Sequence, residues 1–280
     1  MNNDNPVDSK NVNFDVRPKK ALFVVAHQDD EVFIVSRIRK HLTESDQVFV
    51  LWTAVSYQKG EEFKETRLRE SKMLMEKLKI PKSRFCFLMY SDGSTHQHIG
   101  DIVADLTVKI RTIDPDLIYI PAYEGGHIDH DTAHYCTVEA VHQLGSLAEI
   151  YEFPEYSGYA TPLGLLPLRM RRYPKTLGTE CRTLSDEEYN FVLDCWKIFK
   201  SQHFPLNLLI KLSAGKRLTF GVEYTRRLPK YNYQELPPTE KIAYERYLDS
   251  SYEDFKLGIQ NYLNQARGSK TTQQANLFEK

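Results

Sequence analysis

The chain has 280 residues, of which 41% are hydrophobic and 27% are charged, and its formal net charge is −1. This composition is typical of a globular protein with enough apolar material for one large domain or two modest ones. A net charge so close to zero creates no global field for nucleic acid or an anionic membrane, so neither is expected as a partner.

The chain begins with polar residues, and no stretch reaches the roughly 18 apolar residues that would span a bilayer. We therefore expect a cytoplasmic protein without a transmembrane segment. The cysteines are scattered and form no Cys-x-x-Cys pair, which predicts neither a disulfide framework nor a thiolate zinc cluster. They are Cys86, Cys136, Cys181 and Cys195.

Residues 1–18 are aperiodic and rich in Asn and Asp, which predicts a mobile tail. Between residues 21 and 153, short apolar runs alternate with longer amphipathic stretches. The runs are residues 22–26, 48–52, 85–88, 117–120 and 150–153. Strands that alternate with helices predict a Rossmann-like three-layer α/β/α sandwich with a mostly parallel sheet, and we assign this core to residues 19–155.

The alternation stops near residue 156, and residues 156–265 are expected to form a helical extension that packs on the core. One helix should begin at Ser185, because Ser185-x-x-Glu188 has the form of a capping box. Another is predicted over residues 239–262. Residues 266–280 are mostly polar and are interpreted as a second mobile tail.

Two features of this extension have more than one interpretation. Residues 162–168 are apolar and are best interpreted as core, with a pocket lid or a subunit contact as alternatives. The neighbouring Arg169, Arg171 and Arg172 are interpreted as a solvated face, with a phosphate contact as the alternative. The sequence does not decide whether the chain forms a homo-oligomer.

Two polar motifs follow predicted strands. Residues 26–31 read Ala-His-Gln-Asp-Asp-Glu after the first strand, and residues 127–130 read His-Ile-Asp-His after the strand at 117–120. Because parallel strands place their carboxyl ends at one edge of the sheet, these motifs can meet. A His with two adjacent carboxylates offers metal ligands and a spare base, and His-x-Asp-His can add a ligand and an orienting group.

Each motif alone has a simpler interpretation. Asp29 and Asp30 could cap the helix that starts near Glu31, as carboxylates often do. A nucleotide at this turn is disfavoured because a dinucleotide fold needs glycines where these carboxylates stand. His134 could reach a metal from one turn beyond His130, but a packing role is the better interpretation, so it is left out of the ligand set.

With residues 26–31 and 126–130 together, the sequence resembles the PIG-L/LmbE-like zinc-dependent N-deacetylases over roughly residues 20–155. Members of that family hydrolyse N-acetyl groups, usually on glucosamine-containing substrates. Gln28 departs from the family pattern, which usually has proline there. The change frees the backbone but leaves every ligating and catalytic residue type in place.

The resemblance implies that His27, Asp30 and His130 bind zinc and leave one position open for water. Two histidines and a carboxylate also accept Fe²⁺ or Co²⁺, since selectivity among these ions depends on geometry and supply. Zinc is the ion that the family leads us to expect.

The resemblance also assigns catalytic roles. Asp29 would be the general base, taking a proton from water and later helping to deliver one to the departing amine. His127 would stabilise the oxyanion of the tetrahedral intermediate, in a charge state that the sequence leaves open. Asp129 would orient a neighbouring imidazole.

Two further residues are expected to bind substrate. Arg67 lies on the apolar stripe of a helix near residues 61–78, so it either pairs with Glu70 or projects into the crevice. The family resemblance implies that Arg67 recognises substrate hydroxyl groups. Asp92-Gly93 resembles a family element whose carboxylate accepts hydrogen bonds from the sugar, with a simple turn as the alternative.

The sequence thus predicts a hydrolase that removes an N-acetyl group from an amino sugar or its conjugate, releasing acetate and a free amine. The expected partner is a small N-acetylated sugar. Two alternatives stay open: the same metal site acting on another N-acyl or amide substrate, and a carbohydrate-binding relic of the fold without turnover.

Overall fold

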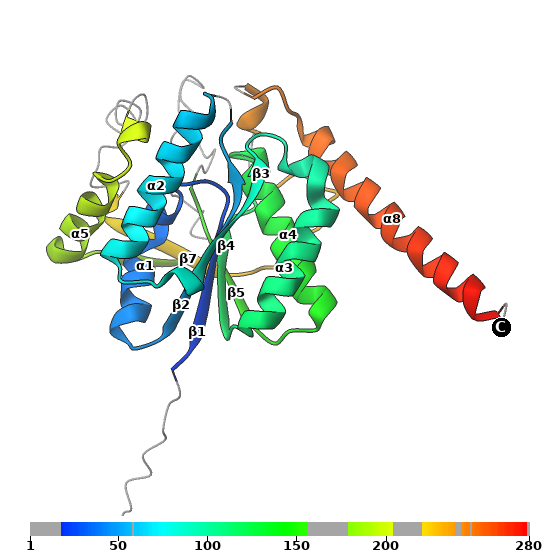
Figure 1. The fold of residues 1–280 in the computed structure, drawn as a ribbon, viewed down its shortest axis with the longest axis horizontal. Coiled ribbons are helices and arrows are strands. Elements are labelled where there is room, and N and C mark those ends of the chain that lie inside the picture. Colours follow the sequence, from blue (N-terminus) through cyan, green and yellow to red (C-terminus); the bar gives the residue numbers. More distant parts are fainter. Residues whose placement is uncertain are drawn as a thin grey trace, which may run out of the picture.

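A seven-stranded sheet lies between two layers of helices (Figure 1). The structure is a computed structural model that describes residues 18–57, 59–155, 179–203, 220–238, 242–246 and 248–278, with side chains as far as residue 266. Among these residues, no helix has the length and apolar character needed to cross a membrane.

The five predicted strands form a parallel sheet in the order β3-β2-β1-β4-β5. They are β1 (Lys20–Val25), β2 (Gln47–Val55), β3 (Phe85–Ser91), β4 (Leu117–Pro121) and β5 (Glu149–Phe153). The central strand β1 is apolar over residues 21–25 and completely buried there, as expected for a parallel strand covered on both faces. The predicted α/β class and the mostly parallel sheet are confirmed.

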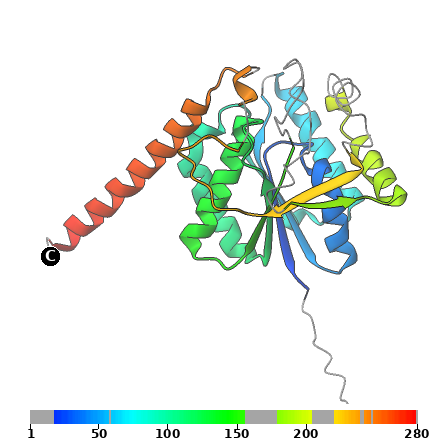
Figure 2. The same ribbon diagram turned by 180° about the vertical axis from the view of Figure 1, so that it is seen from behind.

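Two further strands extend the sheet beyond β5, and sequence analysis did not predict them. β7 (Val222–Arg227) runs antiparallel to β5, and β6 (Glu180–Thr183) runs antiparallel to β7, as Figure 2 shows from behind. Both strands are polar, so they lack the apolar run that marks a core strand. The charges that β7 buries are paired, because Glu223 contacts Arg37 at 2.7 Å and Arg226 contacts Glu152.

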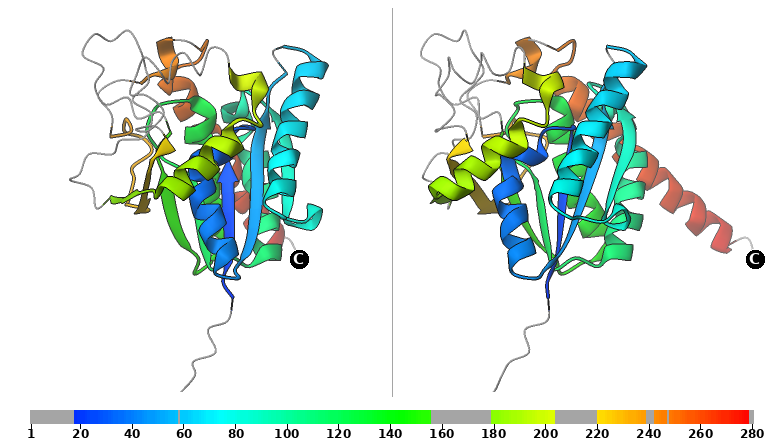
Figure 3. Two further views of the ribbon diagram at one scale, coloured as in Figure 1. Left: turned by 90° about the vertical axis from the view of Figure 1, so that its left-hand side faces the viewer. Right: turned by 60° about the vertical axis from the view of Figure 1, so that its left-hand side comes forward.

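The helices divide between the two faces of the sheet. One face is covered by α1 (Glu31–Thr43), α2 (Glu61–Lys77) and α5 (Asp186–Trp196), which Figure 3 turns toward the viewer. The other face is covered by α3 (Ile99–Ile113), α4 (Ile128–Leu144) and α8 (Tyr252–Phe278). Single turns of 3-10 helix connect these elements: η1 (Lys82–Arg84), η2 (Thr95–His98), η4 (Lys200–Gln202) and η5 (Tyr244–Arg246).

The helix starts differ in how well the sequence predicted them. The capping box at Ser185 is present, since its side chain accepts from the Glu188 N–H and Glu188 accepts from the Ser185 N–H. The prediction of a helix from residue 239 is wrong, because α8 begins only at Tyr252. Ser251 and Asp254 cap that start reciprocally: the Ser251 hydroxyl accepts from Asp254 N–H at 3.2 Å, and Asp254 accepts from Ser251 N–H at 2.7 Å.

Several predictions concern segments that the structure does not describe. The tail before residue 18, the apolar residues 162–168 and the basic cluster at 169–172 lie outside the described residues. At the other end, α8 continues as a helix to Phe278, through the polar segment that begins at residue 266.

Gly258 allows α8 to lie directly against η2. A Cβ atom built on Gly258 would stand 2.2 Å from the carbonyl oxygen of His96, a separation that real Cβ atoms do not adopt. The neighbouring Thr95 holds a buried carboxylate of the site described below. Close packing of α8 therefore supports the loop that follows β3.

Replacing Gly258 by Ala should lower the free energy of unfolding by about 1–3 kcal/mol, because the new methyl group overlaps backbone that cannot rotate away. Denaturant titration followed by circular dichroism measures this change. Gly100→Ala is the matched control, since its Cβ would meet nothing closer than 3.7 Å and should leave stability unchanged or slightly raised. Equal effects of the two substitutions would contradict the packing argument.

Candidate metal centre

Three strand ends bring polar segments together at the carboxyl edge of the sheet. β4 pairs with β1 on one side and with β5 on the other, all in parallel. The segments that follow these strands therefore emerge side by side. The first provides residues 27–31, the second leads into residues 127–130 at the start of α4, and the third contains Glu155.

The three predicted metal ligands form a compact triangle of donor atoms. His27 Nδ1 lies 3.2 Å from His130 Nε2, His130 Nε2 lies 3.2 Å from Asp30 Oδ2, and Asp30 Oδ2 lies 3.6 Å from His27 Nδ1. Donors about 2.0–2.1 Å from a tetrahedral ion are about 3.3–3.4 Å apart. The three side chains are almost completely buried. Their donor types and spacing fit one divalent ion.

Local hydrogen bonds give the first motif its shape. The His27 N–H donates to Asp30 Oδ2 at 2.6 Å, and the Asp29 N–H donates to Glu31 Oε2 at 2.9 Å. Asp29 has φ of +125°, a backbone conformation that favours glycine. The strained Asp29 therefore lies in a turn that the carboxylates of Asp30 and Glu31 close.

The buried carboxylate of Glu31 holds this turn in place by accepting hydrogen bonds. Sequence analysis did not assign this role. Its carboxylate accepts hydrogen bonds from the Trp52 indole at 3.0 Å and the Ser71 hydroxyl at 2.6 Å, as well as from the Asp29 backbone. Burial raises the pKa of Glu31 to about 7, against the effect of these donors. Its place in the first motif was the only signal in the sequence.

Asp29 faces Arg67. The Arg67 guanidinium donates to Asp29 Oδ1 and to the carbonyl oxygen of Gln28. Burial raises the pKa of Asp29 to about 8, and the positive charge of Arg67 opposes that rise. Glu70 instead accepts from the Ser201 N–H at 3.0 Å and from its hydroxyl at 2.5 Å. Arg67 therefore contacts the turn of the first motif.

The other ring nitrogen of His27 is surrounded by carboxylates. His27 Nε2 lies 2.9 Å from Asp129 Oδ2 and 3.2 Å from Asp92 Oδ1. Burial alone would lower the pKa of His27, but Asp92, Asp129 and Asp30 outweigh it and hold that pKa well above its usual value. Asp129 is fixed by further donors, among them the Thr95 hydroxyl at 2.5 Å. The imidazole that Asp129 contacts most closely is therefore that of His27.

His127 lies beside this cluster as the N-cap of α4. Its Nδ1 accepts a hydrogen bond from the Asp129 N–H at 3.2 Å, so a neutral ring carries its proton on Nε2. Burial and the positive charge of His27 lower the pKa of His127 to about 4. At neutral pH the side chain is therefore a neutral hydrogen-bond donor.

His134 stands one helical turn beyond His130 but points elsewhere. Its Nδ1 lies 2.8 Å from the carbonyl oxygen of Pro121, and its Nε2 lies 3.0 Å from the Tyr233 hydroxyl. These contacts join α4 to β4 and to the segment after β7. Leaving His134 out of the ligand set agrees with this packing.

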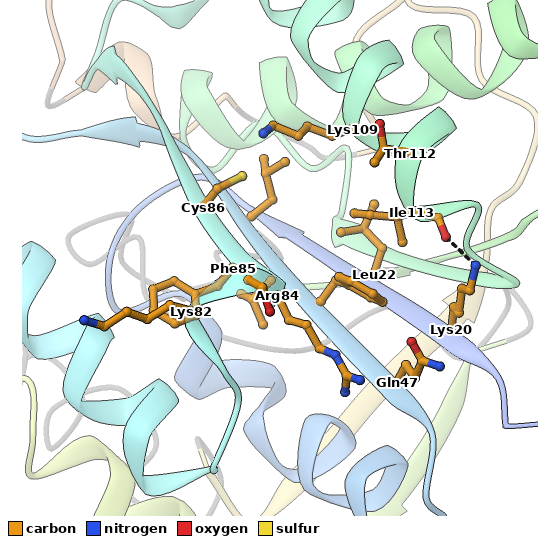
Figure 4. A pocket seen from close by; sticks show the side chains of 14 residues that line it. Lys20, Leu22, Gln47, Lys82, Arg84, Phe85, Cys86, Lys109, Thr112 and Ile113 are labelled. Carbon is orange, nitrogen blue, oxygen red and sulfur yellow. Dashed lines mark hydrogen bonds between the residues drawn. The ribbon is translucent and has the colours of Figure 1, made fainter.

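A separate pocket of about 440 Å³ lies at the opposite edge of the sheet, where β2 and β3 begin (Figure 4). Its lining includes the cations Lys20, Lys82, Arg84 and Lys109 but no His, Asp or Glu. Burial raises the pKa of the Cys86 thiol, which keeps it protonated. This pocket has no acid–base pair, so the chemistry is assigned to the carboxyl edge.

Residues 22–141 match the PIG-L family, described as GlcNAc-PI de-N-acetylase. The chain carries a PIG-L family domain. The matched segment contains both polar motifs, which confirms the family expected from the sequence. No curated protein matches the chain in a sequence comparison.

Several solved structures share the fold of this chain. A teicoplanin deacetylase in a zinc-inhibited form aligns with TM-score 0.55 and 13% identity, over 76% of this chain and 100% of the other. An A40926 pseudoaglycone deacetylase gives TM-score 0.56, 16% identity and coverage of 77% and 99%. The N,N'-diacetylchitobiose deacetylase of Pyrococcus horikoshii aligns with TM-score 0.56 and 18% identity, over 80% of this chain and 88% of the other.

The PIG-L domain should bind one divalent ion, and binding should stabilise it. At a free metal concentration about 100 times the Kd, the free energy of unfolding should rise by about 2.7 kcal/mol. His130→Ala should abolish this rise because it removes one of three protein ligands. Thermal unfolding with and without Zn²⁺ or Co²⁺, together with metal analysis, measures the effect.

His142→Ala is the matched control, because His142 lies on the same helix with its side chain 83% exposed. It should keep both the bound metal and the thermal shift. A His130→Ala protein that binds metal as tightly as the wild type would contradict the ligand assignment.

Proposed function

We propose that this protein is a metal-dependent hydrolase that removes the N-acetyl group from an amino sugar or its conjugate. Water adds to the acetyl carbon, the C–N bond breaks, and acetate and a free amine are released. The observation that carries the proposal is the triangle of His27, Asp30 and His130 beside the carboxylate of Asp29. The family match and the deacetylase activities of the similar structures support it.

The proposed metal is Zn²⁺, held by His27, Asp30 and His130, with Fe²⁺ or Co²⁺ as alternatives. A bound divalent ion would supply Lewis acidity toward a carbonyl oxygen and toward water. One similar deacetylase is known in a zinc-inhibited form, so the assay should titrate zinc rather than add it in excess.

Asp29 is proposed as the general base. It is next to the ligand Asp30 in the chain, and Arg67 anchors one of its carboxylate oxygens. Burial makes Asp29 a stronger base than an exposed carboxylate, and the positive charge of a bound divalent ion would favour the ionised form that accepts a proton from water. The same group then delivers that proton to the amine nitrogen as the C–N bond breaks.

His127 is proposed to donate its Nε2–H to the oxygen that becomes negative during the addition of water. The hydrogen bond from Asp129 N–H to Nδ1 fixes this tautomer. The side chain of Asp129 is proposed to orient His27, which it contacts at 2.9 Å. We propose that His127 acts in its neutral form, because burial lowers its pKa to about 4.

Exposure indicates the side from which substrate enters. The side chains of His127 and Asp92 are 12% and 13% exposed, whereas that of Asp129 is completely buried. We propose that Asp92 accepts hydrogen bonds from sugar hydroxyl groups at this opening. Arg67, which also anchors Asp29, is proposed to contact sugar hydroxyl groups.

Asp29→Asn should reduce kcat by about 10²–10⁴-fold while the protein keeps its metal, because the amide cannot accept the proton. Asn has the same shape as Asp and tolerates positive φ better than most residues, so the strained turn should survive. Acetate release from an N-acetylglucosamine substrate measures kcat, and metal analysis of the same sample tests retention. A near-normal kcat in metal-loaded Asp29→Asn would rule out Asp29 as the base.

A further inference from the structure

Glu155 is a buried carboxylate outside the triangle of proposed metal ligands. It follows β5, is completely buried, and neither of its carboxylate oxygens accepts a hydrogen bond from any residue that the structure describes. Its backbone is held in place because its N–H donates to Glu124 Oε1 at 2.7 Å. A buried carboxylate without donors is costly, so this position needs a compensating group.

The side chain of Glu155 faces two of the proposed metal ligands. Its Oε1 lies 3.8 Å from His130 Nδ1, an ion-pair distance rather than a direct hydrogen bond. One carboxylate oxygen from Asp30, one from Glu155 and one ring nitrogen of His130 lie within 4.8 Å of one another. Burial, and then the charge of Asp30, raise the pKa of Glu155 well above its usual value.

The two ring nitrogens of His130 face different groups. Its Nε2 is the atom in the ligand triangle, 3.2 Å from both His27 Nδ1 and Asp30 Oδ2. A neutral imidazole that offers Nε2 to a cation carries its proton on Nδ1. That N–H then faces the carboxylate of Glu155. Carboxylates behind ligating histidines fix the ring and increase its basicity.

We propose that Glu155 is a positioning residue, which orients the His130 ring for metal binding by facing its Nδ1–H. The inference rests on the proposed metal site and extends it to a residue in the third strand-end segment.

The test compares metal binding by the full-length wild type and Glu155→Gln, which removes the charge and keeps the shape. Competition with a chromogenic chelator gives the Kd for Zn²⁺ and Co²⁺, and the visible spectrum of the Co²⁺ form reports the coordinating atoms. We expect the variant to bind both ions about 10–100-fold more weakly. Its Co²⁺ spectrum should keep the wild-type shape, and the metal-free protein should unfold at no lower temperature.

Glu223→Gln is the matched control, because Glu223 is equally buried but pairs with Arg37 at 2.7 Å. It should lose stability and keep the wild-type metal affinity. If Glu155→Gln does not fold, Glu155→Asp replaces it, since the shorter side chain keeps the charge but withdraws it from His130. That variant should also bind metal more weakly.

Unchanged affinity in a folded Glu155 variant would overturn the inference. An altered Co²⁺ spectrum would overturn it in another way, because Glu155 would then be a direct ligand. A wild-type protein that binds neither ion would instead count against the metal site itself and the proposed function. Weaker binding with an unaltered spectrum supports the positioning role.

Discussion

The main constraint on this structure is that several carboxylates are buried close together where β1, β4 and β5 end. Parallel strands bring Asp29, Asp30, Asp129 and Glu155 to one edge of the sheet, and the interior around them has a low dielectric. Such an arrangement is stable only when each carboxylate has a counter-charge or a donor. Arg67 meets Asp29, and His27 lies next to Asp129. A divalent ion at the proposed site would add positive charge beside Asp30 and Glu155.

Elements far from this edge help to hold it. Ser201 binds both carboxylate oxygens of Glu70, one turn beyond Arg67 on α2, and so attaches η4 to the helix that supplies the arginine. On the other face, α8 packs through Gly258 against η2, whose Thr95 donates to Asp129. The second half of the chain therefore supports the loops of the PIG-L domain from both sides of the sheet.

The apolar strands, their parallel direction and the meeting of the two motifs were predictable, because each depends on local pattern and on the rule for strand ends. The polar strands β6 and β7 were not, since their buried charges are compensated by partners distant in sequence, such as Arg37 for Glu223. The contacts of Arg67 could not be predicted from the helix pattern. Glu70, its expected partner, binds Ser201, which is 131 residues further along the chain. Glu155 carries no motif, and only three-dimensional proximity identifies it.

The central claim is that a divalent ion at this edge drives hydrolysis of an N-acetyl amine. The most direct test is amine release from free, glycosidic, nucleotide-linked and lipid-linked N-acetylglucosamine by purified protein whose bound metal has been quantified. The account predicts release from at least one compound, abolished by a chelator and restored by a stoichiometric divalent ion. Metal-loaded protein that releases no amine from any of them would contradict it.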